Sequence, residues 1–417
     1  MKDSGISWVG EIPKEWQTLK SKFIFKQRNT RGNNICIRLL SPTQKYGVIP
    51  QDNYEELTGM NAVKLNNNTN YALLKTIHKG DYCISLRSFQ GGFEYSEYEG
   101  VVSPAYQVFY PIITIADGYY KYLFKERGFI DIMNSYTMSL RDGKNIAFDD
   151  FGDTFIPVPP LAEQQRIAEF LDRECGKIDG LKVDIQAQID TLEQYKRSII
   201  TEAVTHGLNP SAPMKDSGIP WVGQFPTHWT KKKGKYILRY MSKPVKQDDG
   251  VITCFRDGEV TLRSNRREDG FTMADKEIGY QGVDVGDLVV HGMDGFAGAI
   301  GISDSRGKAS PVLNVLNTKQ NKKYIMYYLR SMAYGEVFTA LSTGIRVRSC
   351  DLRWNKLAEL LYPLPPIDEQ NNIVNYIDEQ IARTNEIIAD KKLQIETLDG
   401  YKKSLIYEYV TGKKEVV

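Results

Sequence analysis

The feature that most constrains this chain is an internal repeat of its own first residues. The sequence begins MKDSGISWVGEIPKEW (Met1–Trp16), and MKDSGIPWVGQFPTHW follows in mid-chain (Met214–Trp229). The two stretches are identical at eleven of sixteen positions without a gap, and they lie 213 residues apart in a chain of 417. Self-similarity at a fixed offset indicates duplicated structural units. We therefore expect the chain to contain two copies of one unit.

A second pair of repeats marks the end of each unit. PPLAEQQRIAEFLD (Pro159–Asp172) matches PPIDEQNNIVNYID (Pro365–Asp378) at an offset of 206. At the same offset, LEQYKRSIITEAVT (Leu192–Thr205) matches LDGYKKSLIYEYVT (Leu398–Thr411). The stretches between the repeats differ far more, although Gly80-Asp81 and Gly286-Asp287 also keep this offset. The predicted segments are a first large domain (1–158), a first long helix (159–208), a linker (209–213), a second large domain (214–364), and a second long helix with a C-terminal tail (365–417).

The short repeats have the properties of long helices. Each opens after a Pro-Pro pair, which suits a helix start but not a helix interior. Apolar residues then recur every seven positions, as in a coiled-coil seam. In the first helix this seam is formed by Leu171, Ile178, Ile185, Leu192 and Ile199. We assign Ile167, Leu181 and Tyr195 to the companion row, which Glu174 and Gln188 interrupt. In the second, less regular helix the corresponding residues are Ile373, Ile377, Ile381, Ile387, Ile388, Ile395, Leu398, Tyr401 and Leu405.

One long helix cannot bury such an apolar strip by itself. Two of them in one chain are most simply buried against each other, so we expect a coiled coil of the two helices. The alternative is two unrelated surface helices, each packed on its own domain.

The large segments indicate a mixed fold of strands and helices, the α+β class. Short β-branched and aromatic runs are separated by Gly, Asn and Asp, as strands are by turns. One amphipathic helix is expected in each segment, over residues 116–135 and 322–341. The glycine-rich stretch Gly292–Gly301 is interpreted as a tight turn between strands.

Composition and motifs exclude several classes of protein. No apolar run approaches the ~20 residues of a membrane helix, and the first residues lack the apolar core of a signal peptide. The five cysteines have no CxxC spacing, and the four histidines are scattered, so we expect a reduced cytoplasmic protein without a disulfide framework, zinc site or other metal. The phosphate loop, the dinucleotide fingerprint and GxSxG are all absent. We therefore predict no catalytic residue in this chain. A nuclease site built from scattered Asp and Glu remains an open alternative.

The charge distribution points to a nucleic acid. Residues 214–360 carry a net charge of +7, and residues 1–155 carry +1, whereas both predicted helices are acidic. Arginine can contact base edges and phosphates, and lysine neutralises phosphates. We selected basic residues close to turn residues and aromatics as candidates for DNA contact. They are Arg28, Arg31, Arg38, Lys45, Arg87, Arg141 and Lys144 in the first segment, and Arg256, Arg263, Arg266, Arg267, Arg346 and Arg348 in the second.

Taken together, the repeats resemble a known family. Two variable domains, each followed by a helix that opens with Pro-Pro-x-x-Glu-Gln and closes with LEQYKRSIITEAVTHG or LDGYKKSLIYEYVTG, are similar to the specificity subunit of type I restriction-modification systems. The repeated openings SGISWVGEIPKEW and SGIPWVGQFPTHW also resemble this family. The resemblance extends over the whole chain.

The resemblance implies a non-catalytic subunit that reads a split target in double-stranded DNA. Each large domain would be a target recognition domain, and the two helices would form an antiparallel coiled coil with pseudo-two-fold symmetry. The helices would dock two methyltransferase (modification) subunits and, through the complex, the restriction subunits. S-adenosylmethionine, ATP and Mg would be used by those partners, with no cofactor in this chain and no membrane contact.

Helix length bounds the distance between the two half-sites. A helix of about 45 residues is about 67 Å long, which corresponds to at most roughly 20 base pairs. Two other functions stay open at this point: a coiled-coil scaffold without a DNA role, and a nuclease with built-in recognition domains.

Overall fold

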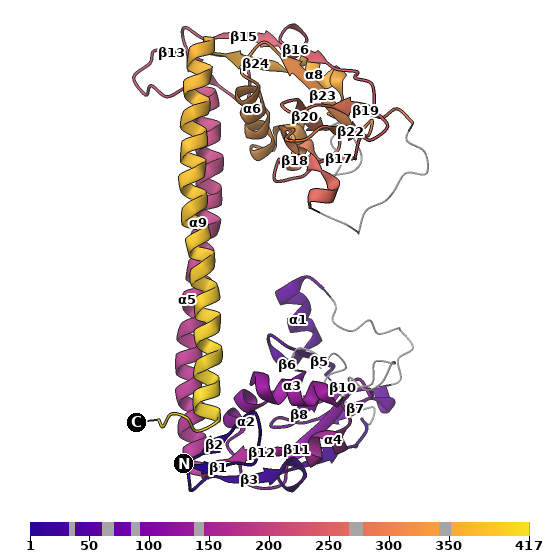
Figure 1. The fold of residues 1–417 in the computed structure, drawn as a ribbon, viewed down its shortest axis with the longest axis vertical. Helices are drawn as coiled ribbons and strands as arrows, with labels where there is room; N and C mark the ends of the chain where they lie inside the picture. Colours follow the sequence, from indigo (N-terminus) through magenta and orange to yellow (C-terminus); the bar gives the residue numbers. More distant parts are fainter. Residues whose placement is uncertain are drawn as a thin grey trace. The chain divides into compact units, whose positions relative to one another are not determined.

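The computed structural model describes residues 1–32, 38–60, 71–84, 92–136, 146–266, 278–341 and 352–416. The chain divides into two compact units (Figure 1). Unit 1 contains Met1–Ile185 and Leu393–Val417, and unit 2 contains Gln186–Lys392. Each unit therefore consists of one large domain together with a part of each of the two long helices.

Unit 1 is built on a four-stranded antiparallel sheet of order β4-β11-β8-β9. Its strands are β4 (Phe25–Arg28), β11 (Gln107–Pro111), β8 (Tyr82–Ile84) and β9 (Phe93–Tyr95). One face of this sheet carries a buried cluster of aromatic rings. Phe109 stands at its centre, with its ring 5.4 Å from that of Tyr82 and 4.8 Å from that of Phe151. Alternate strand residues thus supply one face of the core.

Short strand pairs and helices surround this sheet. The pairs are β1 (Lys2–Asp3) with β2 (Glu11–Ile12), β3 (Gln17–Lys20) with β12 (Phe155–Val158), β5 (Leu40–Thr43) with β6 (Gly47–Pro50), and β7 (Lys75–Ile77) with β10 (Gly100–Val102). The helices are α1 (Gln51–Thr58), α2 (Asp117–Leu123), α3 (Arg127–Ser135) and α4 (Phe148–Asp153).

Unit 2 repeats this topology although its sequence differs. Its four-stranded sheet has the order β16-β23-β20-β21, from β16 (Leu238–Tyr240), β23 (Leu313–Thr318), β20 (Leu288–His291) and β21 (Ile300–Ile302). The strand pairs are β13 (Met214–Asp216) with β14 (Gln224–Pro226), β15 (Thr230–Lys233) with β24 (Leu361–Leu364), β17 (Ile252–Cys254) with β18 (Val260–Leu262), and β19 (Gln281–Val283) with β22 (Gly307–Ala309). Its short helices are α6 (Lys322–Tyr334), α7 (Val337–Ala340) and α8 (Trp354–Glu359). The mixed helix-and-strand fold is confirmed. The glycine-rich stretch connects β20 to β21 through a short 3-10 helix (Gly295–Ala297) rather than a single tight turn.

Each helix expected in the large segments is divided in two. In unit 1, Glu126 has an extended backbone and its side chain accepts a hydrogen bond from the backbone N–H of Phe129, so α2 ends and α3 begins there. In unit 2, Gly335 and Glu336 separate α6 from α7, and Glu336 has a left-handed φ of 56°. The expectation of one continuous helix was wrong in both units. In unit 1 the side chain of Glu126 caps a new helix start, and in unit 2 α6 ends at Gly335.

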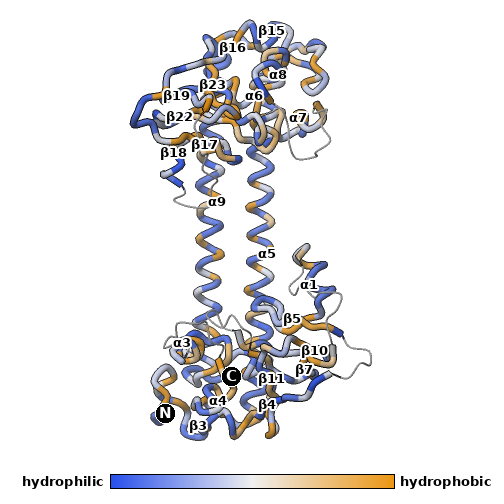
Figure 2. The backbone as a smooth tube through the Cα atoms, turned by 90° about the vertical axis from the view of Figure 1, so that its right-hand side faces the viewer, coloured by the Kyte–Doolittle hydropathy of each residue, from blue (hydrophilic) through white to orange (hydrophobic). Residues whose placement is uncertain are grey.

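The two long helices are α5 (Leu161–His206) and α9 (Ile367–Val410). Hydrophobic and hydrophilic residues alternate along both of them (Figure 2). Glycine follows each helix in a left-handed conformation, with a φ of 78° at Gly207 and 69° at Gly412. A residue with a side chain is strained in this conformation, which explains why glycine ends both repeats.

The two helices contact each other in an antiparallel direction within each unit. In unit 1, Lys182 pairs with Asp399 and Asp179 pairs with Lys402. In unit 2, the ammonium group of Lys196 donates to Asn385 at 2.8 Å, and that of Lys391 donates to Gln188 at 2.5 Å. In both units the residue number rises on one helix as it falls on the other. Knobs-into-holes packing and the pseudo-two-fold axis stay predictions.

The burial of α5 corrects the predicted companion row. Of the fourteen predicted strip residues in the two helices, Ile387 and Tyr401 are exposed and the other twelve are not. In the predicted companion row, Ile167 is buried as expected, but Leu181 and Tyr195 are 52% and 51% exposed. The second row lies four residues after the seam positions, at Cys175, Lys182, Ile189 and Lys196, rather than three. The apolar pattern did not reveal this second row, because two of its members are lysines. The ammonium groups of Lys182 and Lys196 form hydrogen bonds to side chains of α9.

The repeated sequence motifs meet at the helix starts. The indole N–H of Trp16 donates to Glu163 at 2.8 Å, and that of Trp229 donates to Glu369 at 3.0 Å. Each glutamate belongs to a Pro-Pro-x-x-Glu-Gln motif, and the next residue, Gln164 or Gln370, also anchors the large domain. Gln164 accepts from the backbone N–H of Ala116, and Gln370 does the same from Asn321, each at 3.0 Å. These bonds fix each large domain on the helix that follows it.

Candidate nucleic-acid interface

The candidate DNA-contact residues fall into three groups in the structure. Some lie outside the described residues: Arg87, Arg141, Lys144, Arg267, Arg346 and Arg348. Some are exposed: Arg31, Arg38, Lys45, Arg256 and Arg266. Arg28 and Arg263 are half-buried. The role of every one of them in DNA contact stays a prediction.

Arg28 is held inside unit 1 by a two-pronged ion pair. Its Nε and a terminal nitrogen donate to the two carboxylate oxygens of Asp81 at 2.6 and 3.0 Å. The guanidinium also lies 4.4 Å from the ring centre of Tyr110. Asp81 is buried and accepts a further bond from the backbone N–H of His78. These contacts indicate that Arg28 stabilises the turn before β8 through Asp81.

Unit 2 contains a similar arrangement, in which the aspartate and its backbone donor keep the 206-residue offset but the cation does not. The buried carboxylate of Asp287 pairs with Lys243 and accepts from the backbone N–H of Asp284 at 2.8 Å. The repeated Gly-Asp pair thus lies in a turn in both units. Its aspartate accepts a hydrogen bond from a backbone N–H three residues earlier and forms an ion pair with Arg28 or Lys243. Sequence reasoning noticed the repeat but did not assign it this role.

The exposed basic residues of unit 1 gather near aromatic rings. Arg38 lies 5.7 Å from the ring centre of Tyr98 and pairs with Asp52 at 3.3 Å. Lys45, in the turn between β5 and β6, lies 5.0 Å from the ring centre of Tyr46. Both cations are accessible to a phosphate, since exposed ion pairs are weak and easily exchanged.

A cavity of about 680 Å³ adjoins this turn within unit 1. Lys45, Lys121 and Glu94 contribute to its lining, together with residues of α5 and α9. Glu94 is buried and pairs with Lys125 at 2.5 Å. Burial raises the pKa of Glu94 to about 7, although Lys125 opposes that shift. The cavity therefore has a mixed lining of both charges.

Unit 2 presents its exposed arginines around the hairpin of β17 and β18. Arg266 lies 4.1 Å from the ring centre of Phe255 and pairs with Asp257 at 2.7 Å and Glu259 at 2.9 Å. Arg256 pairs with Asp294 at 2.9 Å. Carboxylates thus orient both arginines before any ligand binds, which lowers the entropy lost when they bind DNA.

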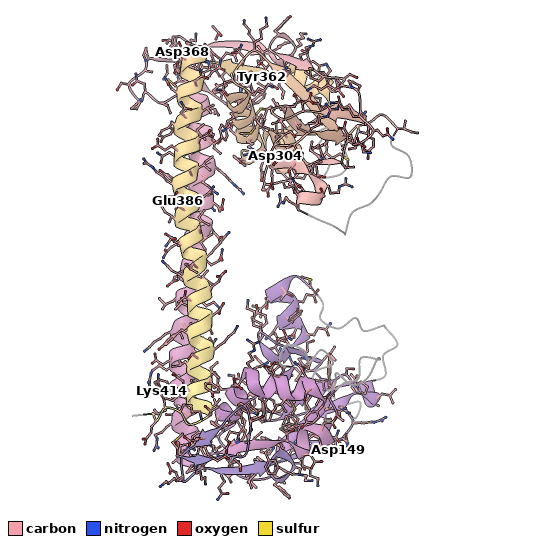
Figure 3. All side chains as sticks on the ribbon, in the orientation of Figure 1. Asp149, Asp304, Tyr362, Asp368, Glu386 and Lys414 are labelled. Carbon is pink, nitrogen blue, oxygen red and sulfur yellow. The ribbon has the colours of Figure 1, made fainter. Side chains whose placement is uncertain are left out.

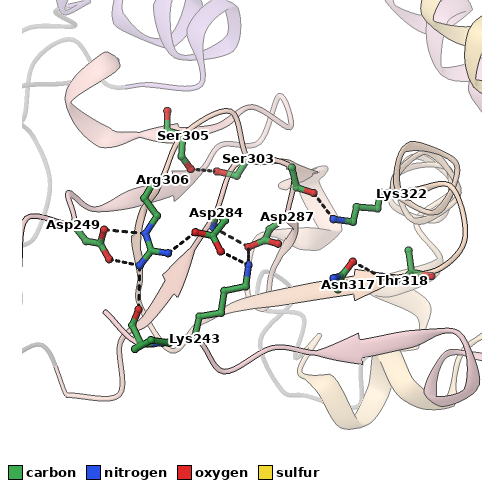
Figure 4. Close-up of polar contacts among 12 residues, drawn as sticks. Lys243, Asp249, Asp284, Asp287, Ser303, Ser305, Arg306, Asn317, Thr318 and Lys322 are labelled. Atoms are coloured by element: carbon green, nitrogen blue, oxygen red, sulfur yellow. Dashed lines mark hydrogen bonds and ion pairs between the residues drawn. The ribbon is translucent and has the colours of Figure 1, made fainter. Parts of the chain in front are cut away.

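A second charged cluster stiffens the same unit (Figure 4). Arg306 binds both oxygens of Asp249, at 3.0 and 2.8 Å, and also contacts Asp284. The hydrogen bonds from Arg306 hold the pKa of Asp249 at about 2. Lys243 joins Asp284 to Asp287, so the cluster connects to the Gly-Asp turn. Its cations are already engaged by carboxylates, which favours a role in shaping the domain.

In the described parts of the chain, no three His, Cys, Asp or Glu side chains are grouped as a metal site would require. Among the same residues, no helix combines the length and the apolar character needed to cross a membrane.

Comparison with known proteins supplies an independent line of evidence. Residues 13–191 match the family model of the type I restriction modification DNA specificity domain. The specificity subunit of the type I restriction enzyme EcoBI of Escherichia coli is 32% identical over 78 residues, which are 19% of this chain and 16% of that protein. A putative type I specificity subunit, MjaX of Methanocaldococcus jannaschii, is 24% identical over 280 residues, or 63% of this chain and 59% of that protein. The alignments thus span less than two thirds of these relatives.

Solved structures share the fold over nearly the whole chain. A structure from work on complex assembly and conformational transition of the type I R-M system has a TM-score of 0.67, with 97% of this chain and 100% of that chain covered. The HsdS subunit of Thermoanaerobacter tengcongensis has a TM-score of 0.51, with 97% and 98% covered. Both are 14% identical, so they show the fold. Together these matches confirm the resemblance that the sequence repeats indicated.

Proposed function

We propose that this chain, which carries the type I restriction modification DNA specificity domain over residues 13–191, is the sequence-specific DNA-recognition subunit of a type I restriction-modification complex. Each large domain reads one half of a split target. The observation that carries this proposal is the duplication itself. Two domains of one topology, each anchored by a Trp-Glu bond to its helix, are what a reader of two separate half-sites needs.

The chain performs recognition and leaves the chemistry to its partners. Two modification subunits dock on it, and the restriction subunits join through that complex. S-adenosylmethionine, ATP and Mg belong to those subunits, and the complex works in the cytoplasm, where the DNA is. Support comes from the family of specificity subunits that the sequence matches.

Two alternatives make different predictions. A coiled-coil scaffold would not bind DNA, whereas a DNA reader loses affinity with rising salt at a slope set by the phosphates it contacts. A nuclease would cleave DNA without partners when Mg is added. The exposed arginines around the β17–β18 hairpin favour the DNA reader.

The decisive experiment is a methylome. The chain is expressed with a modification subunit from the same locus, and modified adenines are mapped by long-read sequencing. We expect one split motif with two short specific halves around an unread gap. A complex that forms but modifies no split motif, and a chain that binds no DNA, would both contradict the proposal.

A further inference from the structure

The glycine-rich stretch Gly292–Gly301 of unit 2 allows two turns of the domain to touch. An added Cβ at Gly301 would lie 2.0 Å from the carbonyl oxygen of Gly258, closer than two such atoms can approach. At Gly298, where φ is 95°, an added Cβ would lie 2.9 Å from the carbonyl oxygen of Arg256. Glycine tolerates both this left-handed φ and such close backbone contact. The turn of the β17–β18 hairpin therefore packs directly against the connection between β20 and β21.

Three further contacts hold the hairpin turn in place. The backbone N–H of Asp304, which Figure 3 labels, donates to the carbonyl of Val260 in β18 at 3.0 Å. The guanidinium of Arg330, in α6, donates to the carbonyl of Ile300 at 2.8 Å and to that of Asp257 at 3.3 Å. The hairpin is thus bonded to both a strand and a helix of the domain, which fixes the position of its turn.

Arg256 is the side chain that this fixed turn presents to solvent. It is 68% exposed, and its Nη2 donates to Asp294 at 2.9 Å. Among the described residues this is the one hydrogen bond of its guanidinium, so the remaining N–H groups are available to a ligand. Arg266 is 36% exposed, and it covers the ring of Phe255 while it pairs with two carboxylates. Arg256 is therefore better placed than Arg266 to form new hydrogen bonds.

Asp294 orients this guanidinium from a fixed position of its own. Its backbone N–H donates to Nδ1 of His291 at 2.9 Å, and the backbone N–H of Met293 donates to the same atom at 3.2 Å. Burial lowers the pKa of His291, which favours the neutral ring that this acceptor role requires. Arg256 is thus held by a carboxylate whose own backbone is bonded to a buried part of the sheet.

The charges at the hairpin turn favour contact with a base edge over contact with a phosphate. The described side chains there include three arginines and three carboxylates, whose charges cancel: Arg256, Arg266, Arg330, Asp257, Glu259 and Asp294. A phosphate brought to Arg256 would meet the carboxylate of Asp294, which repels it. Base edges carry no net charge, and an arginine held in one direction is suited to two parallel hydrogen bonds with O6 and N7 of guanine.

We propose that Arg256 is a specificity-determining residue that reads a guanine in the major groove, and that Asp294 is its positioning residue. This inference rests on the proposed function, because it requires that unit 2 reads one of the half-sites. Phosphate contacts position a protein on DNA without reading its sequence. Those contacts belong to other basic residues of unit 2, and the hairpin turn supplies sequence information. The half-site that unit 2 reads therefore contains a G·C pair.

The first test compares methylomes. The chain is expressed with the modification subunit from the same locus as the unmodified chain, as Arg256→Ala and as Asp294→Asn. We expect Arg256→Ala to lower the preference for guanine at one position by about tenfold or more, with the other positions of the motif retained. Asp294→Asn should weaken the same preference less, and it should strengthen non-specific DNA binding because a negative charge is removed.

A matched control and a second measurement are available. Arg239 is an exposed arginine of β16 in the same unit, so Arg239→Ala removes the same charge and should leave the motif unchanged. The second measurement is DNA binding by the complex, with 7-deazaguanine, which lacks the N7 acceptor, replacing each guanine of the target in turn. One replacement should weaken binding by the unmodified chain but not by Arg256→Ala. With the unmodified chain alone, this probe also serves if Arg256→Ala unfolds at a lower temperature.

The outcomes separate this inference from the proposed function. A target without a G·C pair, an unchanged motif for Arg256→Ala, or no effect of 7-deazaguanine at any position would each overturn the inference and leave the proposed function intact. Loss of the modification subunit from Arg256→Ala would assign the turn to a protein contact and would also overturn it. If the unmodified chain modifies no split motif and binds no DNA, the proposed function itself fails.

Discussion

At the scale of single residues, two tryptophans explain why the chain repeats its own beginning. Trp16 and Trp229 are fully buried, and each donates its indole N–H to the glutamate of the helix motif. Burial raises the pKa of Glu163, while the indole bond opposes that rise. The two sequence motifs, separated by more than a hundred residues, are therefore two sides of one contact.

Replacing Trp16 by Phe should destabilise unit 1 by about 2 kcal/mol, because a hydrogen bond to the half-buried carboxylate of Glu163 is lost. The matched control is Trp8→Phe, since the indole N–H of Trp8 is buried and has no hydrogen-bond partner among the described residues. Urea unfolding followed by fluorescence measures both. Equal losses in the two variants would show that ring volume, rather than the bond to Glu163, stabilises the contact.

Arg28 should behave as a stabilising residue and Lys45 as a DNA-binding residue. Arg28→Ala leaves the buried carboxylate of Asp81 without its guanidinium and should cost about 3 kcal/mol. Lys45→Ala should leave the melting temperature unchanged and reduce the salt slope of DNA binding by about one. Thermal unfolding and binding at several salt concentrations distinguish the two. If Arg28→Ala unfolds with the same free energy as the unmodified chain, Arg28 does not stabilise the fold and is again a candidate for DNA contact.

The stability of unit 1 should depend on the protonation of Glu94. Its pKa is raised to about 7 in the folded chain, against about 4.5 when unfolded. The folded state therefore binds the proton more tightly, so this contribution is complete below about pH 4.5 and is lost as pH rises towards 7. The Glu94→Gln variant should gain stability relative to the unmodified chain between pH 5 and 8. A constant difference across this range would argue against a raised pKa.

At the scale of elements, the pairing of α5 with α9 depends on a row that contains lysines. Lys182 and Lys196 lie at positions where apolar residues are usual, and each bonds to a polar residue of α9. Their long aliphatic stems cover apolar surface while the ammonium groups reach the partner helix. A polar residue in such a row fixes the register of two helices at some cost in stability.

The corrected rows predict opposite results for two neighbouring residues. Ile178 is buried, so Ile178→Ala should lower the free energy of unfolding by about 2–4 kcal/mol. Leu181 is exposed, so Leu181→Ala should change it by at most about 0.5 kcal/mol. Urea unfolding of both variants checks the assignment. A large loss for Leu181→Ala would restore the row that the sequence first indicated.

At the scale of the whole molecule, two domains of one topology accompany two helices of nearly equal length, 46 and 44 residues. The sequences of the large domains differ, while the motifs that fix them to the helices are repeated. This division fits the proposed function, since the half-sites can differ while the docking surfaces stay alike.

Helix length should determine the unread gap of the DNA target. Inserting seven residues, two turns, into both helices preserves the heptad pattern and lengthens each by about 10 Å. We expect the methylome to show the same two half-sites with a longer gap between them. An unchanged gap would contradict the role of the helices as a ruler.

The sequence by itself determined the duplication, the two long helices and the mixed class of the large domains. These features are local or periodic: a Pro-Pro start, a glycine end and a seven-residue apolar repeat act through neighbouring residues along the chain. The sequence also contained both partners of the Trp-Glu contact, yet gave no sign that they meet.

Only the tertiary structure decided which charged residues are free and which helical row is buried. Arg28 and Lys45 look alike in the sequence, but Asp81, 53 residues away from Arg28, engages the first. Leu181 looks more apolar than Lys182, but the antiparallel neighbour on α9 offers Asp399 to the lysine. The physical reason is the same in both cases. Burial and ion pairing are set by residues distant in the chain, and no local pattern encodes which of them will be brought together.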